Sequence, residues 1–198
     1  MPAALVRALA TLAAALAAAH ALAQAPPAPL PPEPPPTPLP AEYSDASRKA
    51  YAAGLKEARE MIAQKRYDAA IARLDALSRE RPREPQARFL KSVAQSEAGK
   101  PDDAVATLTA LAADFPELPE VHNNLAVLYA ARGSLDLAKA ELELAIAASP
   151  DYAPAVENLG DVYARLAARH YERAAALEKG KGLAPAKLKL VRDALAVR

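Results

Sequence analysis

The residue types that most often carry out catalysis are scarce in this chain. It contains three histidines and no cysteine. Outside the N-terminal region the histidines are His122 and His170, which form no H-E-x-x-H metal-binding pattern. We expect His122 to pack between helices and not to act as a metal ligand or a base. The six glycines form neither a phosphate-binding loop nor a G-x-S-x-G turn. The sequence therefore favours a protein that is not an enzyme and that holds no cofactor and no metal.

One charged stripe has a spacing that would suit a basic partner or a cation. Glu157, Asp161 and Arg165 follow one another at intervals of four residues, so they share a face if the segment is helical. The alternative is a solvated face on which Arg165 offsets Asp161, and we favour this alternative. Asp102 and Asp103 are explained by the positive end of a helix dipole.

The charge balance argues against a nucleic-acid partner. The chain has 25 basic and 24 acidic residues, and removal of an N-terminal segment containing Arg7 would leave 24 of each. Nucleic-acid binding needs a basic surface that displaces counterions, and a basic membrane-binding surface is equally unsupported. Without cysteine there is no disulfide framework and no site for a cysteine-linked lipid. No feature indicates a small-molecule substrate, and we expect a protein or peptide partner.

Residues 1–23 have the features of an export signal. Arg7 is the sole charge, the run from Ala8 to Leu22 is apolar, and small residues follow it. This alanine-rich run is short for a membrane span, which needs about 20 strongly apolar residues. We expect cleavage after Ala23, because cleavage before Pro26 would place a proline directly after the scissile bond. The prediction is a bacterial periplasmic protein, and the alternative is an uncleaved segment that tethers the chain to a membrane.

Residues 24–43 form a proline-rich linker. Ten of the 19 prolines fall between Pro26 and Pro40, in the run PPAPLPPEPPPTPLP. Such a run favours an extended polyproline II conformation, which at about 3.1 Å per residue makes a spacer of roughly 45 Å. The alternative is a docking ligand, since several PxxP matches are present.

The remaining sequence repeats with a period of 34 residues. A fixed period of this length is typical of a helix-turn-helix unit that stacks on copies of itself. We therefore expect an all-α solenoid over residues 44–180 and a capping helix in residues 181–198. The positions that carry the period are Pro82, Pro116 and Pro150; Ala70, Ala104 and Ala138; Leu125 and Leu159; Ala126 and Gly160; and Tyr129 and Tyr163.

Turn residues and caps mark the ends of the expected helices. Ser44 or Asp45 is the expected N-cap of the first helix. Gly133 should end one helix and Ser134 should cap the next. Gly160 is small, and we expect it to allow close packing between helices. The repeats cover residues 51–84, 85–118 and 119–152.

The fourth unit departs from the pattern because no glycine turn follows its first helix. We expect one long helix from Ala155 to Leu177, straight or kinked, as an atypical end of the solenoid. Pro185 should then begin a final helix with Leu188, Val191 and Leu195 on one face. This face should dock on the exposed side of the last repeat.

The third unit, PEVHNNLAVLYAARGSLDLAKAELELAIAASPDY, resembles a tetratricopeptide repeat. The family's leucine, small residue, tyrosine and glycine are followed by a close-packing alanine, a bulky residue, a second alanine and a boundary proline. His122 departs from the pattern, since an aromatic residue is usual there. The first two repeats depart further, with Lys65 in the glycine position and Lys91 and Gln95 in the leucine and tyrosine positions. The matching residues are Leu125, Ala126, Tyr129, Gly133, Ala138, Leu142, Ala145 and Pro150.

The resemblance implies a short right-handed solenoid of about 3.5 repeats whose first helices line a concave groove. The implied role is that of a scaffold or adaptor that binds an extended or helical partner peptide, here in the bacterial cell envelope. Asn123 and Asn124 would suit a carboxylate clamp, but Phe89 and Val93 replace its lysines, so we expect no such clamp. The alternative for Phe89 and Val93 is burial in the core. The implied groove residues are Leu55, Arg59, Phe89, Val93, Asn123, Val127, Glu157 and Asp161.

Overall fold

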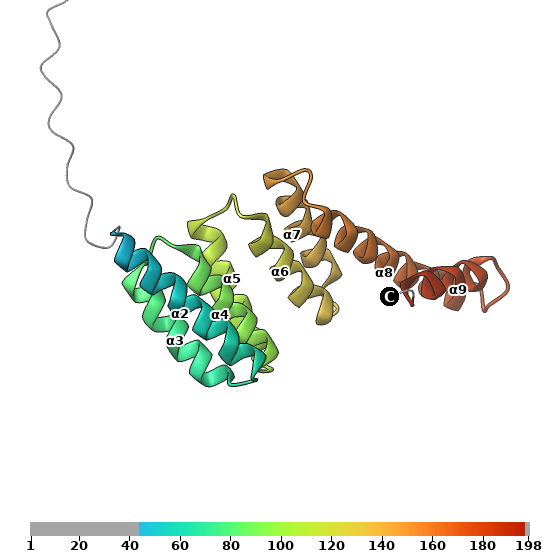
Figure 1. Cartoon of the computed structure of the whole chain (residues 1–198). Helices are drawn as coiled ribbons and strands as arrows, with labels where there is room; N and C mark the ends of the chain where they lie inside the picture. The colour runs from blue at the N-terminus through green and yellow to red at the C-terminus, as the bar shows by residue number, and fades with distance from the viewer. Residues whose placement is uncertain (1–43, 197–198) are drawn as a thin grey trace, which may run out of the picture. The chain divides into compact units, whose positions relative to one another are not determined.

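The computed structural model describes residues 44–196, and in this part the chain forms eight α-helices and no strands (Figure 1). The prediction of an all-α fold is confirmed. The expected signal and linker, residues 1–43, lie outside the described residues. The helices are α2 (Asp45–Ala63), α3 (Tyr67–Glu80), α4 (Pro85–Glu97), α5 (Pro101–Asp114), α6 (Pro119–Ala131), α7 (Leu135–Ala148), α8 (Ala153–Leu177) and α9 (Ala184–Leu195).

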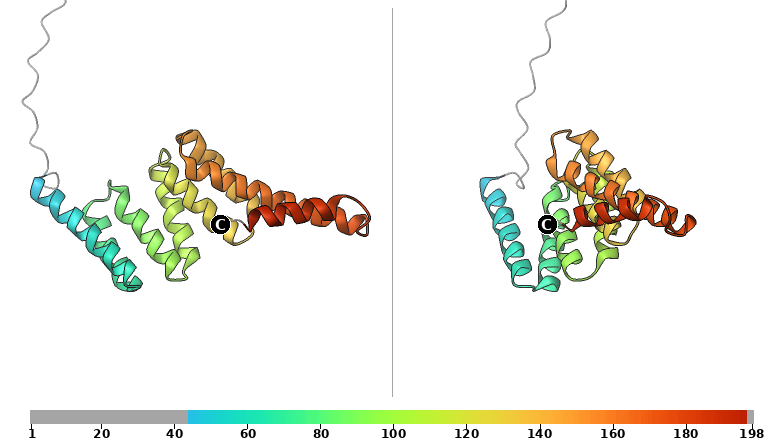
Figure 2. Two further views of the ribbon diagram at one scale, coloured as in Figure 1. Left: turned by 45° about the vertical axis from the view of Figure 1, so that its right-hand side comes forward. Right: turned by 90° about the vertical axis from the view of Figure 1, so that its right-hand side faces the viewer.

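The helices pack in chain order, each against the next (Figures 1 and 2). The pairs α2/α3, α4/α5 and α6/α7 are the three helix-turn-helix units. The first helices of neighbouring units also touch: α2 contacts α4, and α6 contacts α8, whereas contact between α4 and α6 is weaker. Prolines occupy the first turns of α4, α5 and α6, where the missing amide removes no helical hydrogen bond.

The turn inside each unit ends its first helix with one residue in the left-handed conformation. Gly99 and Gly133 have φ of 74° and 76°, and Lys65 has φ of 60° at the equivalent position. The amide after each of them donates to a carbonyl five residues back: Arg66 to Met61 at 2.8 Å, Lys100 to Gln95 at 2.9 Å and Ser134 to Tyr129 at 2.9 Å. All three repeats therefore turn in the same way, although only two have glycine.

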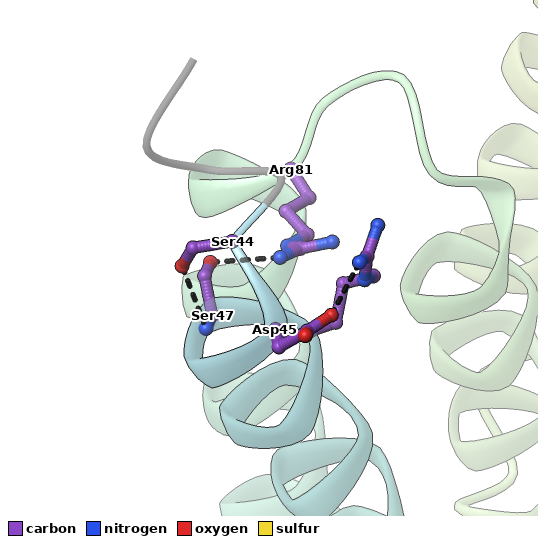
Figure 3. Close-up of polar contacts among 5 residues, drawn as sticks. Ser44, Asp45, Ser47 and Arg81 are labelled. Atoms are coloured by element: carbon purple, nitrogen blue, oxygen red, sulfur yellow. Dashed lines mark hydrogen bonds and ion pairs between the residues drawn. The ribbon is translucent and has the colours of Figure 1, made fainter. Parts of the chain in front are cut away.

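The two predicted serine caps have different outcomes. Ser44 caps α2, because its hydroxyl accepts a hydrogen bond from the Ser47 amide at 3.1 Å (Figure 3). Ser134 precedes α7, but its side chain makes no capping hydrogen bond, so that prediction was wrong. The ψ angle of Ser134 is 59°, whereas that of Ser44 is 152°. Capping side chains need the extended backbone to reach the first amides of the helix.

The core consists of small and large residues that recur with the repeat. Ala70, Ala104 and Ala138 have no exposed surface, and neither has Ala58. Leucines one turn later in the second helices fill the space beside these alanines; Leu74, Leu108 and Leu142 are at most 1% exposed. The alanines let the two helices of a unit approach closely, and the leucines supply most of the buried apolar surface.

Three aspartates form ion pairs that link consecutive repeats. Each aspartate lies in the first turn of the second helix of a unit, and each pairs with a cation from the next repeat. Asp102, which the sequence explains by the helix dipole, has this additional role. Exposed pairs of this kind add little stability. The pairs are Asp68 with Lys100 at 2.8 Å, Asp102 with Arg132 at 2.8 Å, and Asp136 with Arg169 at 3.2 Å.

The fourth unit is one uninterrupted helix, as predicted. Helix α8 spans 25 residues, and α9 packs against it. Arg192 on α9 pairs with Glu172 on α8 at 2.6 Å, and the Lys187 ammonium lies 5.7 Å from the ring centre of Tyr171. The apolar face of α9, made of Leu188, Val191 and Leu195, is half-buried. The final helix therefore docks on the C-terminal part of α8.

Gly160 does not have the packing role that we expected. It is exposed, and a Cβ added there would meet no atom within 4 Å. In a complete repeat the second helix would approach this position. Here that helix is missing, because α8 continues straight and α9 covers only its later residues. The small residue at this position is left without a packing partner.

Candidate functional site

Three cavities follow the first helices of the repeats, and together we call them the groove. The first cavity, of about 350 Å³, lies between α2, α4 and α6. The second, of about 190 Å³, lies farther along α4 and α6, and the third, of about 210 Å³, lies between α6 and α8. Val127 lines both the second and the third cavity. The groove is thus built from the helices that the repeat pattern places on one side.

The first cavity is mostly apolar with charges at its rim. Phe89 and Leu90 from α4 face Leu118 and Val121. Phe89 also packs against the core cluster around Leu108. The Phe89 side chain therefore contacts the core and also lines the cavity. The sequence left a groove position and a core position open as alternatives, and the structure shows both. The rim carries Arg59 from α2 and Glu120 from α6, together with Pro85 and Gln86.

The second cavity reaches between α4 and α6 down to α5. Val93, which is half-buried, lines one wall, and Val127 lines the other. Leu108 of α5 forms the floor of this cavity, since it is 1% exposed. The remaining lining residues are Ser92, Ser96, Glu97, Asn124 and Leu128. This cavity lies where the contact between α4 and α6 is weak, which explains why the space between them is open.

Some of the predicted groove residues line the cavities, and others do not. Arg59, Phe89, Val93, Val127 and Asp161 line cavities. Leu55 is 7% exposed and packs in the core of the first repeat, so it offers little surface to a partner. Glu157 is exposed but lines none of the three cavities.

Asn123 serves the solenoid itself. It is 7% exposed, and its side-chain oxygen accepts a hydrogen bond from the amide group of Asn158 on α8 at 2.8 Å. The bond joins the first helices of the third and fourth units. This bond uses the side-chain oxygen of Asn123, and burial of the residue limits the access of a peptide carboxylate to its NH2 group. Asn124 has the freer position, because it lines the second cavity.

Five charged groove residues make no ion pair within residues 44–196. Arg59 and Glu120 lie at the first cavity, Glu97 at the second, and Asp161 and Arg165 at the third. Asp161 and Arg165 are exposed, in keeping with the solvated face that we favoured, and both are available to a partner. The charge of Glu120 also acts on Tyr152, whose pKa is raised mainly by burial and further by this carboxylate.

His122 packs between helices, as predicted. It is 6% exposed, with Nδ1 2.8 Å from a carboxylate oxygen of Glu141 on α7 and Nε2 3.3 Å from the carbonyl oxygen of Pro116. These contacts tie α6 to the helix that follows it and to the preceding turn. Within residues 44–196 no three histidine, aspartate or glutamate side chains are placed to hold a metal ion.

Sequence reasoning missed the role of Arg81 at the first repeat boundary. Arg81 is only 8% exposed; it donates to the Ser47 hydroxyl at 2.7 Å (Figure 3) and lies 5.0 Å from the ring centre of Tyr51. It also pairs with Glu84 at 3.7 Å. The side chain fastens the start of α2 to the loop before α4. Its position beside Pro82, a periodic residue, was the available signal.

The fold and the groove define a class of protein, the helical-repeat solenoids. Tetratricopeptide repeat models match residues 55–96 and 95–166, which together make up more than half of the chain. The chain belongs to the tetratricopeptide repeat family. No curated protein matches it in sequence. Among the described helices, none is long and apolar enough to cross a membrane.

Solved structures with the same fold include proteins from bacteria and other sources. The thermophilic protein TTC0263 of Thermus thermophilus is 24% identical, with 74% of this chain and 83% of that chain covered and a TM-score of 0.54. The Yersinia enterocolitica type III secretion chaperone SycD, in complex with a peptide of the translocator YopD, is 15% identical, with 62% and 98% covered and a TM-score of 0.54. The first repeat domain of Spaghetti (RPAP3), bound to an HSP90 peptide, is 18% identical, with 60% and 94% covered and a TM-score of 0.54.

Proposed function

We propose that this protein is an exported scaffold of the bacterial cell envelope that binds a segment of a partner protein in its groove. The observation that carries the proposal is the run of apolar cavities along α2, α4, α6 and α8. Two of the structural relatives, SycD and Spaghetti, were solved with peptides of other proteins. An open apolar groove on a rigid helical frame suits peptide binding because little conformational entropy is lost on the scaffold side.

The location in the periplasm is proposed from the sequence of residues 1–23. An apolar run with one preceding charge and small residues near its end supports export and cleavage after Ala23. Intact-mass analysis of the protein purified from the envelope tests this. A mass that begins at Gln24 supports the periplasmic form. A mass that retains Met1 would support the alternative, a membrane-tethered module held away from the bilayer by the proline-rich linker.

Partner capture tests the binding role. Val127 is 48% exposed and lines two cavities, so Val127→Ser should remove apolar contact surface without opening the core. Phe89→Ser is a less selective change, because Phe89 also packs against the core. We expect Val127→Ser to lose partners that the unaltered protein retains from an envelope extract, with an unchanged melting temperature.

The matched control is Leu144→Ser. Leu144 is 51% exposed on α7 and lines none of the three cavities, so it removes a similar amount of apolar surface outside the groove. This variant should retain the same partners as the unaltered protein. Equal capture by Val127→Ser and the unaltered protein would contradict binding in the groove.

A further inference from the structure

The walls of the first and second cavities repeat at an interval of seven residues. On α4 the first cavity is lined by residues 85, 86, 89 and 90, and the second by residues 92, 93, 96 and 97. On α6 the same interval relates Glu120 to Val127 and Val121 to Leu128. Seven residues are two helical turns, or about 10.5 Å along a helix axis. The two cavities are thus successive sockets in one cleft between α4 and α6.

The cleft exists because α4 and α6 do not close against each other as α6 and α8 do. Each socket has two walls, one from each helix, and the deeper one reaches the buried Leu108. In packed helices, apolar side chains of one helix insert into the spaces between side chains of the helices that face it. The space is therefore shaped to complete a helical packing arrangement that the solenoid leaves open.

We infer that the partner segment is an amphipathic helix that lies along this cleft and inserts large apolar side chains spaced seven residues apart into the two sockets. This inference rests on the proposed function and specifies the partner's chemistry. A helix matches both sockets because its own side chains recur on one face every two turns. A β-strand does not match, because residues about 10 Å apart on it, three positions on, point to opposite faces.

A polyproline II segment matches the cleft less well. Its residues recur on one face every three positions, at about 9.3 Å, and its usual docking grooves are lined by aromatic rings. Phe89 is the one aromatic residue among the lining residues of the two sockets. The sizes of the sockets add a preference: the first, of about 350 Å³, suits an aromatic or long aliphatic side chain, and the second, of about 190 Å³, suits a smaller one.

Charge sets the direction of the partner helix. Helices α4 and α6 both begin at the first socket and end at the second, so the positive ends of their dipoles lie at the first and the negative ends at the second. Glu97, which makes no ion pair within residues 44–196, adds negative charge at the second socket. We therefore expect the partner helix to run antiparallel to α4. In this orientation the positive N-terminus of the partner helix and a basic residue of the partner lie at the second socket, beside Glu97.

A panel of synthetic 20-residue peptides tests this inference on the purified full chain by fluorescence anisotropy. The first set has a helical alanine, lysine and glutamate background, a leucine at position 7, a leucine, methionine or phenylalanine at position 14, and a lysine one turn before position 7. The second set has the same compositions with the anchors at positions 7 and 12, which lie on different faces. The third set is proline-rich, with leucines three residues apart. We expect the first set to bind at least tenfold more tightly than the second.

Protein variants locate the binding. Ser96→Arg should fill the mouth of the second socket and weaken binding of the first set at least tenfold, because Ser96 is an exposed wall residue. Leu144→Arg, on α7 outside the groove, should leave binding unchanged. Glu97→Lys should weaken binding severalfold, and a peptide with glutamate in place of the lysine beside the leucine should restore it. Circular dichroism of each variant checks that the helices remain folded.

The possible failures are distinguishable. Equal binding by the first two sets, or no measurable binding by the first, would overturn the helical partner. If the proline-rich set alone binds, and Ser96→Arg abolishes that binding, the occupant is an extended segment, and the groove keeps its proposed function. If the affinity of every peptide is the same for Ser96→Arg, Val127→Ser and the unaltered protein, the cleft is not the binding site. Capture of the native partner by the groove variants then tests the proposed function separately.

Discussion

Lys65 shows at the scale of single residues how a degenerate repeat keeps the geometry of a regular one. It adopts φ of 60°, close to the 74° and 76° of Gly99 and Gly133. The left-handed conformation brings Cβ too close to the following carbonyl group and costs a residue other than glycine roughly 1–2 kcal/mol. Glycine avoids this cost but loses more backbone entropy on folding. The first turn therefore contains strain that the second and third turns avoid.

Lys65→Gly is expected to stabilise the protein by about 0.5–1 kcal/mol, which is the relief of this strain less the entropy cost. Urea denaturation with the midpoint as readout measures the change. Gly133→Lys is the reciprocal variant, and it should destabilise because of φ alone, since a Cβ at Gly133 would meet nothing within 4 Å. A lower midpoint for Lys65→Gly would show that the lysine side chain contributes more than the strain removes.

Tyr51 is a buried tyrosine whose pKa is shifted in the folded chain. It is 7% exposed, and burial raises its pKa; Glu84 raises it further, while the Ala87 amide and Arg81 lower it. The unfolded chain therefore loses this proton at about pH 10, the ordinary tyrosine value, before the folded chain does. The stability that the buried neutral phenol contributes is complete below that pH and is lost as the pH rises through the raised pKa.

Tyr51→Phe should accordingly make the loss of stability above about pH 10 less steep. Urea midpoints measured from neutral pH to about pH 11 give the comparison. Tyr163→Phe provides the control, because Tyr163 is 49% exposed. If both variants lose stability as steeply as the unaltered protein, ionisation of Tyr51 is not coupled to unfolding.

At the scale of the helical elements, the two helices of each unit pack around a buried alanine that leaves no space for a larger side chain. Ala138 of α7 has no exposed surface and belongs to the core cluster with Ala126 and Leu142. Ala138→Leu should destabilise by about 1–3 kcal/mol, because the added carbons must displace α6 or its side chains. Ala140→Leu on the exposed side of the same helix should have little effect. Equal denaturation midpoints for the two variants would contradict this account of the packing.

Helix α8 contains a glycine that its surroundings do not require. Gly160→Ala should stabilise by about 0.5–1 kcal/mol, because alanine has the higher helix propensity and the added methyl group meets no neighbour. Gly54 in α2 is the contrasting position: a Cβ there would lie 2.8 Å from Leu77 Cδ2. Gly54→Ala should therefore gain less or destabilise. Thermal melts measure both variants. A higher melting temperature for Gly160→Ala reports helix propensity, and a lower one for Gly54→Ala reports the steric clash with Leu77.

At the scale of the whole described solenoid, contacts join neighbouring helices in chain order. Such architectures gain stability from adjacent units, so a local defect spreads little. Replacing Leu188 and Val191 with aspartate should detach α9 and expose the end of α8. Hydrogen exchange followed by mass spectrometry should then become faster in the part of α8 around Tyr171 and Glu172, which α9 contacts, and stay unchanged in α2 to α5. Faster exchange throughout the chain would indicate long-range coupling.

The repeat itself was readable from the sequence because its signals are local. The 34-residue spacing of Ala70, Ala104 and Ala138 follows from the close approach of two helices in every unit, and each helix keeps its apolar face at a period of 3.6 residues. The long α8 was also predicted from nearby residues, because residues 164–177 are mostly strong helix formers and match no turn of the repeat. These features depend on residues close together in the chain.

The tertiary structure alone decided which groove residues are accessible. Leu55 and Asn123 occupy periodic positions equivalent to Phe89 and Glu157, yet both are buried while Glu157 is exposed. Asn123 is covered by α8, whereas in the described residues no further repeat follows α8 to cover Glu157. How closely neighbouring repeats approach, as α6 and α8 do and α4 and α6 do not, is set by the fit of many side chains across each interface. For the same reason the two sockets between α4 and α6, and the empty surroundings of Gly160, became evident only in the folded chain.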